Sequence, residues 1–204
     1  MVTTRHLRAA AEADDVDQRV FLRDVTWKDL EIVLAIRGER GAPRITYLKG
    51  DLELMSPSRS HEGIKTTLAR MLEAWATERG LVLEGFGSWT MRNAPRERAA
   101  EPDECYILGG QLKEVPDLAI EVIWTSGGLD KLEVYRGLGV GEVWIWQKGA
   151  IQVFVLRGGI YEQVPSSLLL PAVALAAMCR CLEEAETQTE AVRAFVAGSA
   201  MVGG

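Results

Sequence analysis

Two short strand-like segments of the sequence each carry a carboxylate where burial would be costly. The first, Glu-Pro-Asp-Glu-Cys-Tyr-Ile, contains Asp103, and the second, Pro-Asp-Leu-Ala-Ile-Glu-Val-Ile, contains Glu121. An ionised carboxylate inside a sheet costs several kcal/mol unless it is paired, protonated or bound to a metal. Lys131 follows shortly after the second segment. Two acids and a lysine in this order suggest a divalent-metal site for phosphodiester cleavage.

The length of the connection between the segments predicts that the two acids face each other. If residues 109–115 form the turn of an antiparallel hairpin centred near Leu112, Asp103 lies opposite Glu121, with Cβ atoms about 4.5–5.5 Å apart. Two like charges at that distance repel each other and require compensation. A shared Mg²⁺ or Mn²⁺ ion would supply it, because hard oxygen ligands suit these metals. A structural ion pair at Glu121 and a solvated strand start at Asp103 are the alternatives.

Three further side chains are candidates to act with the acid pair. Lys131 could fold back over the strand end and hold the attacking water or stabilise the charged transition state, while the metal would activate the nucleophile. A helical wheel of the long helix beginning at His61 turns His61 toward the sheet and Glu62 roughly the opposite way, so Glu62 is secondary. A surface lysine and a non-catalytic histidine are the structural alternatives.

Periodicity and turn residues predict the elements that position these side chains. Expected strands cover 44–48, 51–55, 81–86, 88–92, 102–107, 117–123, 142–146, 151–156 and 160–164. Expected helices cover 27–36 after a Thr26 cap, 61–79, a stretch from a Ser126 cap through Tyr135, and most of 168–197. Residues 5–20 are interpreted as a solvated helix or loose arm. The pattern predicts a single α+β domain over residues 1–204, built around a mixed sheet.

Composition sets limits on the partners of the chain. The 204 residues carry a net charge of −6, which counts against a general nucleic-acid coat protein that binds through many phosphate contacts. It does not exclude a nuclease whose acids hold a cation. Three cysteines, no visible secretory signal and no apolar run of membrane-spanning length favour a reducing cytoplasm and no membrane partner.

Four motifs together resemble the Uma-two family of restriction-endonuclease-like proteins in the PD-(D/E)xK nuclease superfamily. They are RITYLKGDLELMSP from Arg44, then Ser-His-Glu at 60–62, then EPDECYILG, then PDLAIEVIWTSGGLDKLEVYRGLGVGEVWIW. The resemblance covers about residues 25–165, and it implies a restriction-endonuclease-like α/β core there, with a central mixed sheet flanked by helices. Residues 168–197 would then be a C-terminal helical extension.

The same resemblance implies Mg²⁺-dependent hydrolysis of DNA. The motif aspartate matches Asp103, the second acid matches Glu121, and His61 matches a histidine that recurs at the start of the first core helix. The chain departs from the motif at two positions. Ile123 stands where the plain (D/E)xK spacing places lysine, so Lys131 must substitute from the helix, and Thr46 stands where many relatives carry an acid.

The leading hypothesis is a cytoplasmic metal-dependent endodeoxyribonuclease, which in this superfamily often works as a homodimer. Asp103, Glu121 and the carbonyl of Val122 would bind Mg²⁺, and Lys131 would assist the attacking water. The alternative is a catalytically inactive nuclease fold that serves as a binding or oligomerisation module. Sequence does not separate an RNA substrate from a DNA substrate.

Overall fold

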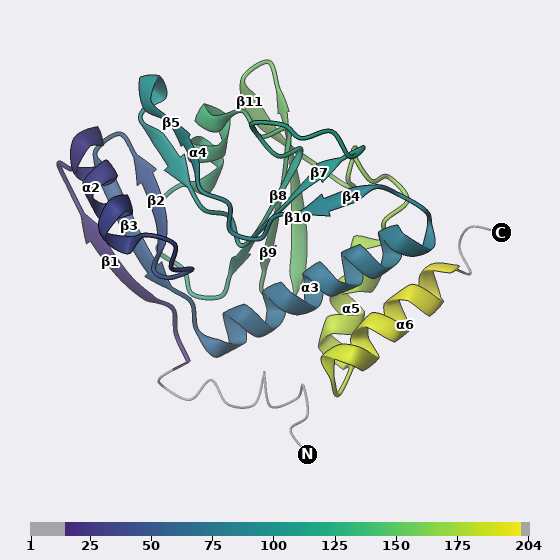
Figure 1. Ribbon diagram of the computed structural model, residues 1–204. Helices are drawn as coiled ribbons and strands as arrows, with labels where there is room; N and C mark the ends of the chain where they lie inside the picture. The colour runs from purple at the N-terminus through teal and green to yellow at the C-terminus, as the bar shows by residue number, and fades with distance from the viewer. Residues whose placement is uncertain (1–14, 201–204) are drawn as a thin grey trace.

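The computed structural model describes residues 15–200, which form two β-sheets and the helices that pack on them (Figure 1). The first sheet is antiparallel, with the strand order β1 (Gln18–Leu22), β3 (Asp51–Ser56), β2 (Arg44–Leu48), β6 (Arg98–Ala100) and β5 (Met91–Asn93). The second sheet has the order β11 (Ile160–Val164), β10 (Ala150–Arg157), β9 (Glu142–Gln147), β8 (Leu118–Ile123), β7 (Glu104–Leu108) and β4 (Leu83–Gly85). Its β8–β9 pair is parallel, so this sheet is mixed. The expected α/β class with a mixed sheet is confirmed, and a second, antiparallel sheet stands beside the mixed one.

The helices cover the sheets on different sides (Figure 1). They are α2 (Trp27–Arg37), α3 (Arg59–Glu78), α4 (Lys131–Leu138), α5 (Leu175–Glu184) and α6 (Gln188–Ala200), with a 3₁₀ turn η1 (Ala94–Arg96). The apolar side of α3 packs on the second sheet, and α5 and α6 pack beside α3 in the same core. None of the helices in the described range combines the length and apolarity that a membrane crossing needs.

Alternation along β8 sends its side chains into two different cores. Leu118, Ile120 and Val122 pack toward α3, whereas Ala119 packs with α4 on the opposite face. Glu121 shares the face of Ala119, because alternate residues of a strand point to the same side. The second acid therefore points toward α4, away from the larger core.

Three local predictions are corrected by the structure. Residues 18–22 form β1, which pairs with β3, instead of continuing a loose arm; residues 5–14 of that arm lie outside the described range. The helix expected from Ser126 begins at Lys131, where the Asp130 side chain accepts the amide hydrogen of Glu133 (3.0 Å). Glycines at 127 and 128 disfavour an earlier start. The C-terminal stretch, expected to be helical from residue 168, begins its first helix only at Leu175 and divides into α5 and α6.

Candidate functional site

The two acids lie opposite each other across the β7–β8 hairpin. Glu104 pairs with Ile120 and Cys105 with Ala119, and extending this antiparallel register by one residue places Asp103 opposite Glu121. The predicted register is thus the observed one. Both residues are buried, with 1% of Asp103 and 3% of Glu121 exposed. Burial of two carboxylates at such close range requires strong partners for each.

Asp103 is held by three donors from three different segments. The backbone N–H of Val122 donates to its Oδ2 (2.6 Å). His61 Nε2 lies 2.9 Å from Oδ1, and the guanidinium of Arg44, on β2, forms an ion pair with the same oxygen. These contacts fix the position of the carboxylate.

Glu121 is held from the α4 side. The hydroxyl of Tyr135 donates to Oε1, and Lys131 Nζ lies 3.3 Å from that oxygen. Burial, and then the Glu121 charge, raise the pKa of Tyr135, so its hydroxyl remains a donor. Lys131 Nζ also donates to Thr46 Oγ1 on β2 (3.0 Å). The ammonium thus bridges the acid of one sheet and a hydroxyl of the other.

His61 faces the sheet, as the helical wheel predicts, and lies between two aspartates. Its Nδ1 is 3.2 Å from Asp17 Oδ2, and its Nε2 contacts Asp103. Both contacts are hydrogen bonds only when both ring nitrogens carry protons, because carboxylates accept and do not donate. Burial tends to raise the pKa of Asp17, but hydrogen bonds from His61 and the Ser58 amide outweigh it and hold that pKa below its ordinary value.

Glu62 lies outside this buried cluster. Its side chain is 40% exposed, and it pairs with Arg44 (2.5 Å) and with Lys65 (3.1 Å). Glu62 therefore reaches Asp103 only through Arg44. This position agrees with its predicted orientation away from the sheet.

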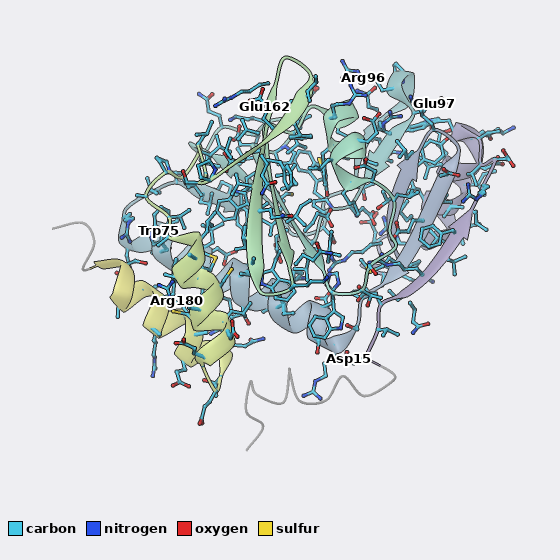
Figure 2. All side chains as sticks on the ribbon, turned by 180° about the vertical axis from the view of Figure 1, so that it is seen from behind. Asp15, Trp75, Arg96, Glu97, Glu162 and Arg180 are labelled. Carbon is cyan, nitrogen blue, oxygen red and sulfur yellow. The ribbon has the colours of Figure 1, made fainter. Side chains whose placement is uncertain are left out.

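A segment next to β1 covers one side of the cluster, beside the start of α3, where Figure 2 labels Asp15. Asp15 accepts a hydrogen bond from the Ser60 amide (3.2 Å), and its carbonyl accepts one from Trp124 Nε1 (2.8 Å). The Asp17 amide donates to Thr125 Oγ1 (3.2 Å). This segment joins the N-terminal end of α3 to the β8–α4 loop.

Glu53 is a further buried acid of the site that sequence reasoning missed. It is 2% exposed and lies directly opposite Thr46 in the β2–β3 ladder. Its Oε2 accepts the amide hydrogen of Leu129 (2.7 Å), and Arg19 Nε lies 3.5 Å from Oε1. A Cβ atom at Gly128 would lie 2.8 Å from Arg19 Nη1. Glu53 thus holds the loop that leads to Lys131.

The missed partners, apart from Tyr135, lie far from Asp103 and Glu121 in sequence. They are Asp17, Arg19, Arg44, Thr46, Glu53 and Tyr135. A signal existed for Glu53 and Thr46, because the predicted β-hairpin already placed an acid opposite a hydroxyl on one face. Tyr135 stood at the end of a predicted helix, but its direction depended on where that helix begins.

The carboxylate oxygens of the buried cluster suit a hard cation that takes two ligands from the protein. In residues 15–200, no group of three His, Cys, Asp or Glu side chains is arranged to hold a metal ion. Mg²⁺ keeps several waters and needs only one or two carboxylates from the protein. Asp103 and Glu121 are the two carboxylates that such a site would use, and residues 15–200 contain no larger set of ligands.

The chain thus has a mixed α/β fold in which a lysine lies beside one of two opposed, buried acids. The chain belongs to the Uma2 family, described as "Putative restriction endonuclease", whose family model matches residues 27–187. A crystal structure from Anabaena variabilis ATCC 29413, titled as a putative nuclease belonging to DUF820, is similar over 79% of this chain and 96% of its own, with 14% identity and a TM-score of 0.47. No curated protein matches the chain.

Proposed function

We propose that this protein is a metal-dependent endonuclease that hydrolyses phosphodiester bonds of DNA. The observation that carries the proposal is the position of Lys131, whose Nζ lies 3.3 Å from one of two opposed, buried carboxylates. Membership of the Uma2 family supports the same chemistry. An ordinary surface lysine would not be drawn over a buried acid in this way.

Asp103, Glu121 and the carbonyl of Val122 would hold Mg²⁺, or Mn²⁺ in its place. Such an ion, when bound, polarises a phosphoryl oxygen and lowers the pKa of water. The chain itself supplies orientation: His61 and Arg44 fix the Asp103 carboxylate.

The lysine has a separate role from the acids. Its ammonium would hold the attacking water or stabilise the negative charge that develops on the phosphate, and such fixed charges act strongly in a site that excludes water. Thr46 positions the ammonium from the first sheet, and Tyr135 positions the carboxylate that faces it.

The second candidate is a catalytically inactive nuclease fold that serves for binding or oligomerisation. Two observations favour it. Ile123 occupies the position that the superfamily motif gives to lysine, and both acids already carry cationic partners in Arg44 and Lys131. A protein of this class would bind nucleic acid or a second copy without metal affinity.

Calorimetric titration with Mg²⁺ and Mn²⁺ separates the two candidates. Wild type is expected to bind at millimolar concentration or tighter, and Glu121→Ala is expected to lose this binding. Glu162→Ala, which removes an exposed acid of a surface ion pair, is the matched control and should bind as wild type does. Absence of binding in the wild type would make Asp103 and Glu121 structural residues and favour the inactive module.

Cleavage assays then test the reaction itself. Supercoiled DNA, linear duplex DNA, single-stranded DNA and RNA are incubated with each protein and either metal. We expect nicking of DNA by wild type and by Glu162→Ala, and none by Glu121→Ala. Cleavage of RNA alone would correct the substrate, and no cleavage of any form would end the enzyme proposal.

A further inference from the structure

An aromatic pocket lies on the second sheet, away from the acid pair. We call it the aromatic pocket, and its volume is about 320 Å³. The residues that line it are Phe86, Trp89, Ile107, Leu112 and Lys113. The rings of Phe86 and Trp89 are tilted at 53° with centroids 5.7 Å apart. Phe86 is 40% exposed and Leu112 is 84% exposed. Large apolar side chains left open to solvent in this way mark a binding surface.

The aromatic pocket and Glu121 share one face of the sheet. Cys105 and Ile107 alternate onto one side of β7, Cys105 pairs with Ala119, and Glu121 points to the same side of β8 as Ala119. Along the chain, Ile107 lies four positions beyond the residue that faces Glu121, or about 13 Å at roughly 3.3 Å per residue. Trp89 packs against the same core as α4, which covers that face. A short oligonucleotide strand could therefore contact both places at once.

The chemistry of the aromatic pocket suits a nucleobase. Open aromatic rings stack on any base, and this stacking does not depend on sequence. Lys113, at the rim, forms a 2.7 Å ion pair with Asp117, so its charge is already partly neutralised. The chain carries a net charge of −6, and it cannot draw its affinity from many phosphate contacts. Base stacking is the source of binding affinity that the aromatic pocket offers instead.

We propose that the aromatic pocket stacks an unpaired base of the nucleic-acid strand whose backbone reaches the acid pair. A base inside a duplex is already stacked and paired, so it must be flipped out or single-stranded to enter. The preferred substrate class is then nucleic acid with unpaired bases, such as single strands, frayed ends or loops. This inference rests on the proposed function and specifies its substrate.

The test measures binding without cleavage, in the presence of a chelator. Fluorescence anisotropy follows the full-length protein with three labelled probes of about 10 nucleotides, within the range that single-strand sites cover. The probes are oligothymidylate, a fully paired duplex, and an abasic strand of the same length and charge. We expect oligothymidylate to bind most tightly, and its affinity to depend weakly on salt.

Substitutions assign the binding to the pocket. Phe86→Ala and Trp89→Ala should each weaken oligothymidylate binding by roughly tenfold or more, while the abasic strand is unaffected. Phe21→Ala is the matched control, because Phe21 on β1 is similarly exposed, at 46%, and lies outside the pocket. Circular dichroism verifies the fold of Trp89→Ala, and the more exposed Phe86→Ala provides the same test if that variant unfolds.

The outcomes are distinct. Equal binding of abasic and oligothymidylate strands, wild-type affinity in both pocket variants, or no binding to oligothymidylate would overturn the proposal. Leu112→Ala tests whether this surface instead binds a second copy of the chain. Loss of a concentration-dependent dimer in this variant, without an effect on oligothymidylate binding, would assign the surface to that second copy. Base-dependent binding that persists while calorimetry detects no metal would support the pocket and remove the nuclease proposal.

Discussion

Lys131 Nζ lies 3.3 Å from Glu121 Oε1, and the lysine reaches this acid from the first position of α4. In the plain motif the lysine would stand on the strand itself, two residues after the acid, where this chain has Ile123. Ile123 instead packs against the apolar core beneath α4. In the proposed nuclease site, the helix would supply the ammonium that the strand does not carry.

Lys131→Met should slow cleavage strongly but keep metal binding. The ammonium is expected to act on the water or the phosphate, and loss of such a group costs about 10²–10³ in rate. Single-turnover cleavage and calorimetry on the same preparation measure the two effects. Lys28→Met, on the exposed side of α2, is the control and should cleave normally. Equal rates for Lys131→Met and wild type would remove the lysine from the reaction.

Moving the lysine back to the strand gives a sharper test of its role. The double variant Ile123→Lys with Lys131→Met should regain part of the cleavage that Lys131→Met loses, because residue 123 shares the sheet face of Glu121. Ile123→Lys alone serves as the reference for any cost of placing a charge there. A double variant no better than Lys131→Met would show that helix α4 alone can position the ammonium.

Tyr135→Phe should destabilise the fold more than Tyr161→Phe. Tyr135 donates its hydroxyl hydrogen to the Glu121 carboxylate, whereas Tyr161 donates to the neutral carbonyl of Val140. Hydrogen bonds to charged groups contribute about 1.5–3 kcal/mol, against about 1 kcal/mol for neutral pairs. Urea denaturation gives both free energies of unfolding. Equal losses of unfolding free energy in the two variants would mean that Glu121 does not need the hydrogen bond from Tyr135.

Glu133 should contribute stability that is lost in acid. Hydrogen bonds from Arg136, and then from the buried Arg98, lower the pKa of Glu133 to about 2 from an ordinary value of 4.5. A carboxylate whose pKa is lower in the folded than in the unfolded protein stabilises the fold at pH values above its unfolded pKa. This contribution disappears as pH falls from about 4.5 toward 2. Unfolding free energies across that range should fall less steeply for Glu133→Gln than for wild type. Glu162→Gln, in an exposed ion pair, should retain the wild-type slope.

Gly128→Ala should lower the rate of cleavage. The added Cβ would approach Arg19 Nη1 to 2.8 Å and Glu53 Oε2 to 3.2 Å, and it would displace the loop that leads to Lys131. A misplacement of about 1 Å can cost about 10²-fold in rate. Gly41→Ala meets no atom within 4 Å and is the control. Unchanged cleavage by Gly128→Ala would mean that the loop tolerates the shift.

The local part of the site could be predicted from sequence because hairpin geometry is local. Turn length and strand alternation together place Asp103 opposite Glu121, and the wheel of the long helix turns His61 inward. The start of α4 was misplaced because Ser126 and Asp130 are both acceptable caps. Gly127 and Gly128 lie between these two caps and favour a helix that begins after the later one, Asp130.

The remaining partners could not be predicted because they depend on how two sheets meet. Lys131 contacts Thr46 across 85 positions of the chain, and Arg44 reaches Asp103 from the first sheet. Periodicity within a segment states which face is apolar but not which other element will cover it. The strands of both sheets were largely expected, but their division into two sheets was not.

The bridge from Glu121 through Lys131 to Thr46 also has a consequence for the order of folding. The acid pair belongs to a hairpin that closes a short loop, whereas the Thr46 contact must wait until distant segments are brought together, and such contacts form slowly. During refolding, we therefore expect the capacity to bind a divalent ion to return before the capacity to cut. The proposed site would then pass through a stage that can hold a cation but has no fixed ammonium beside it.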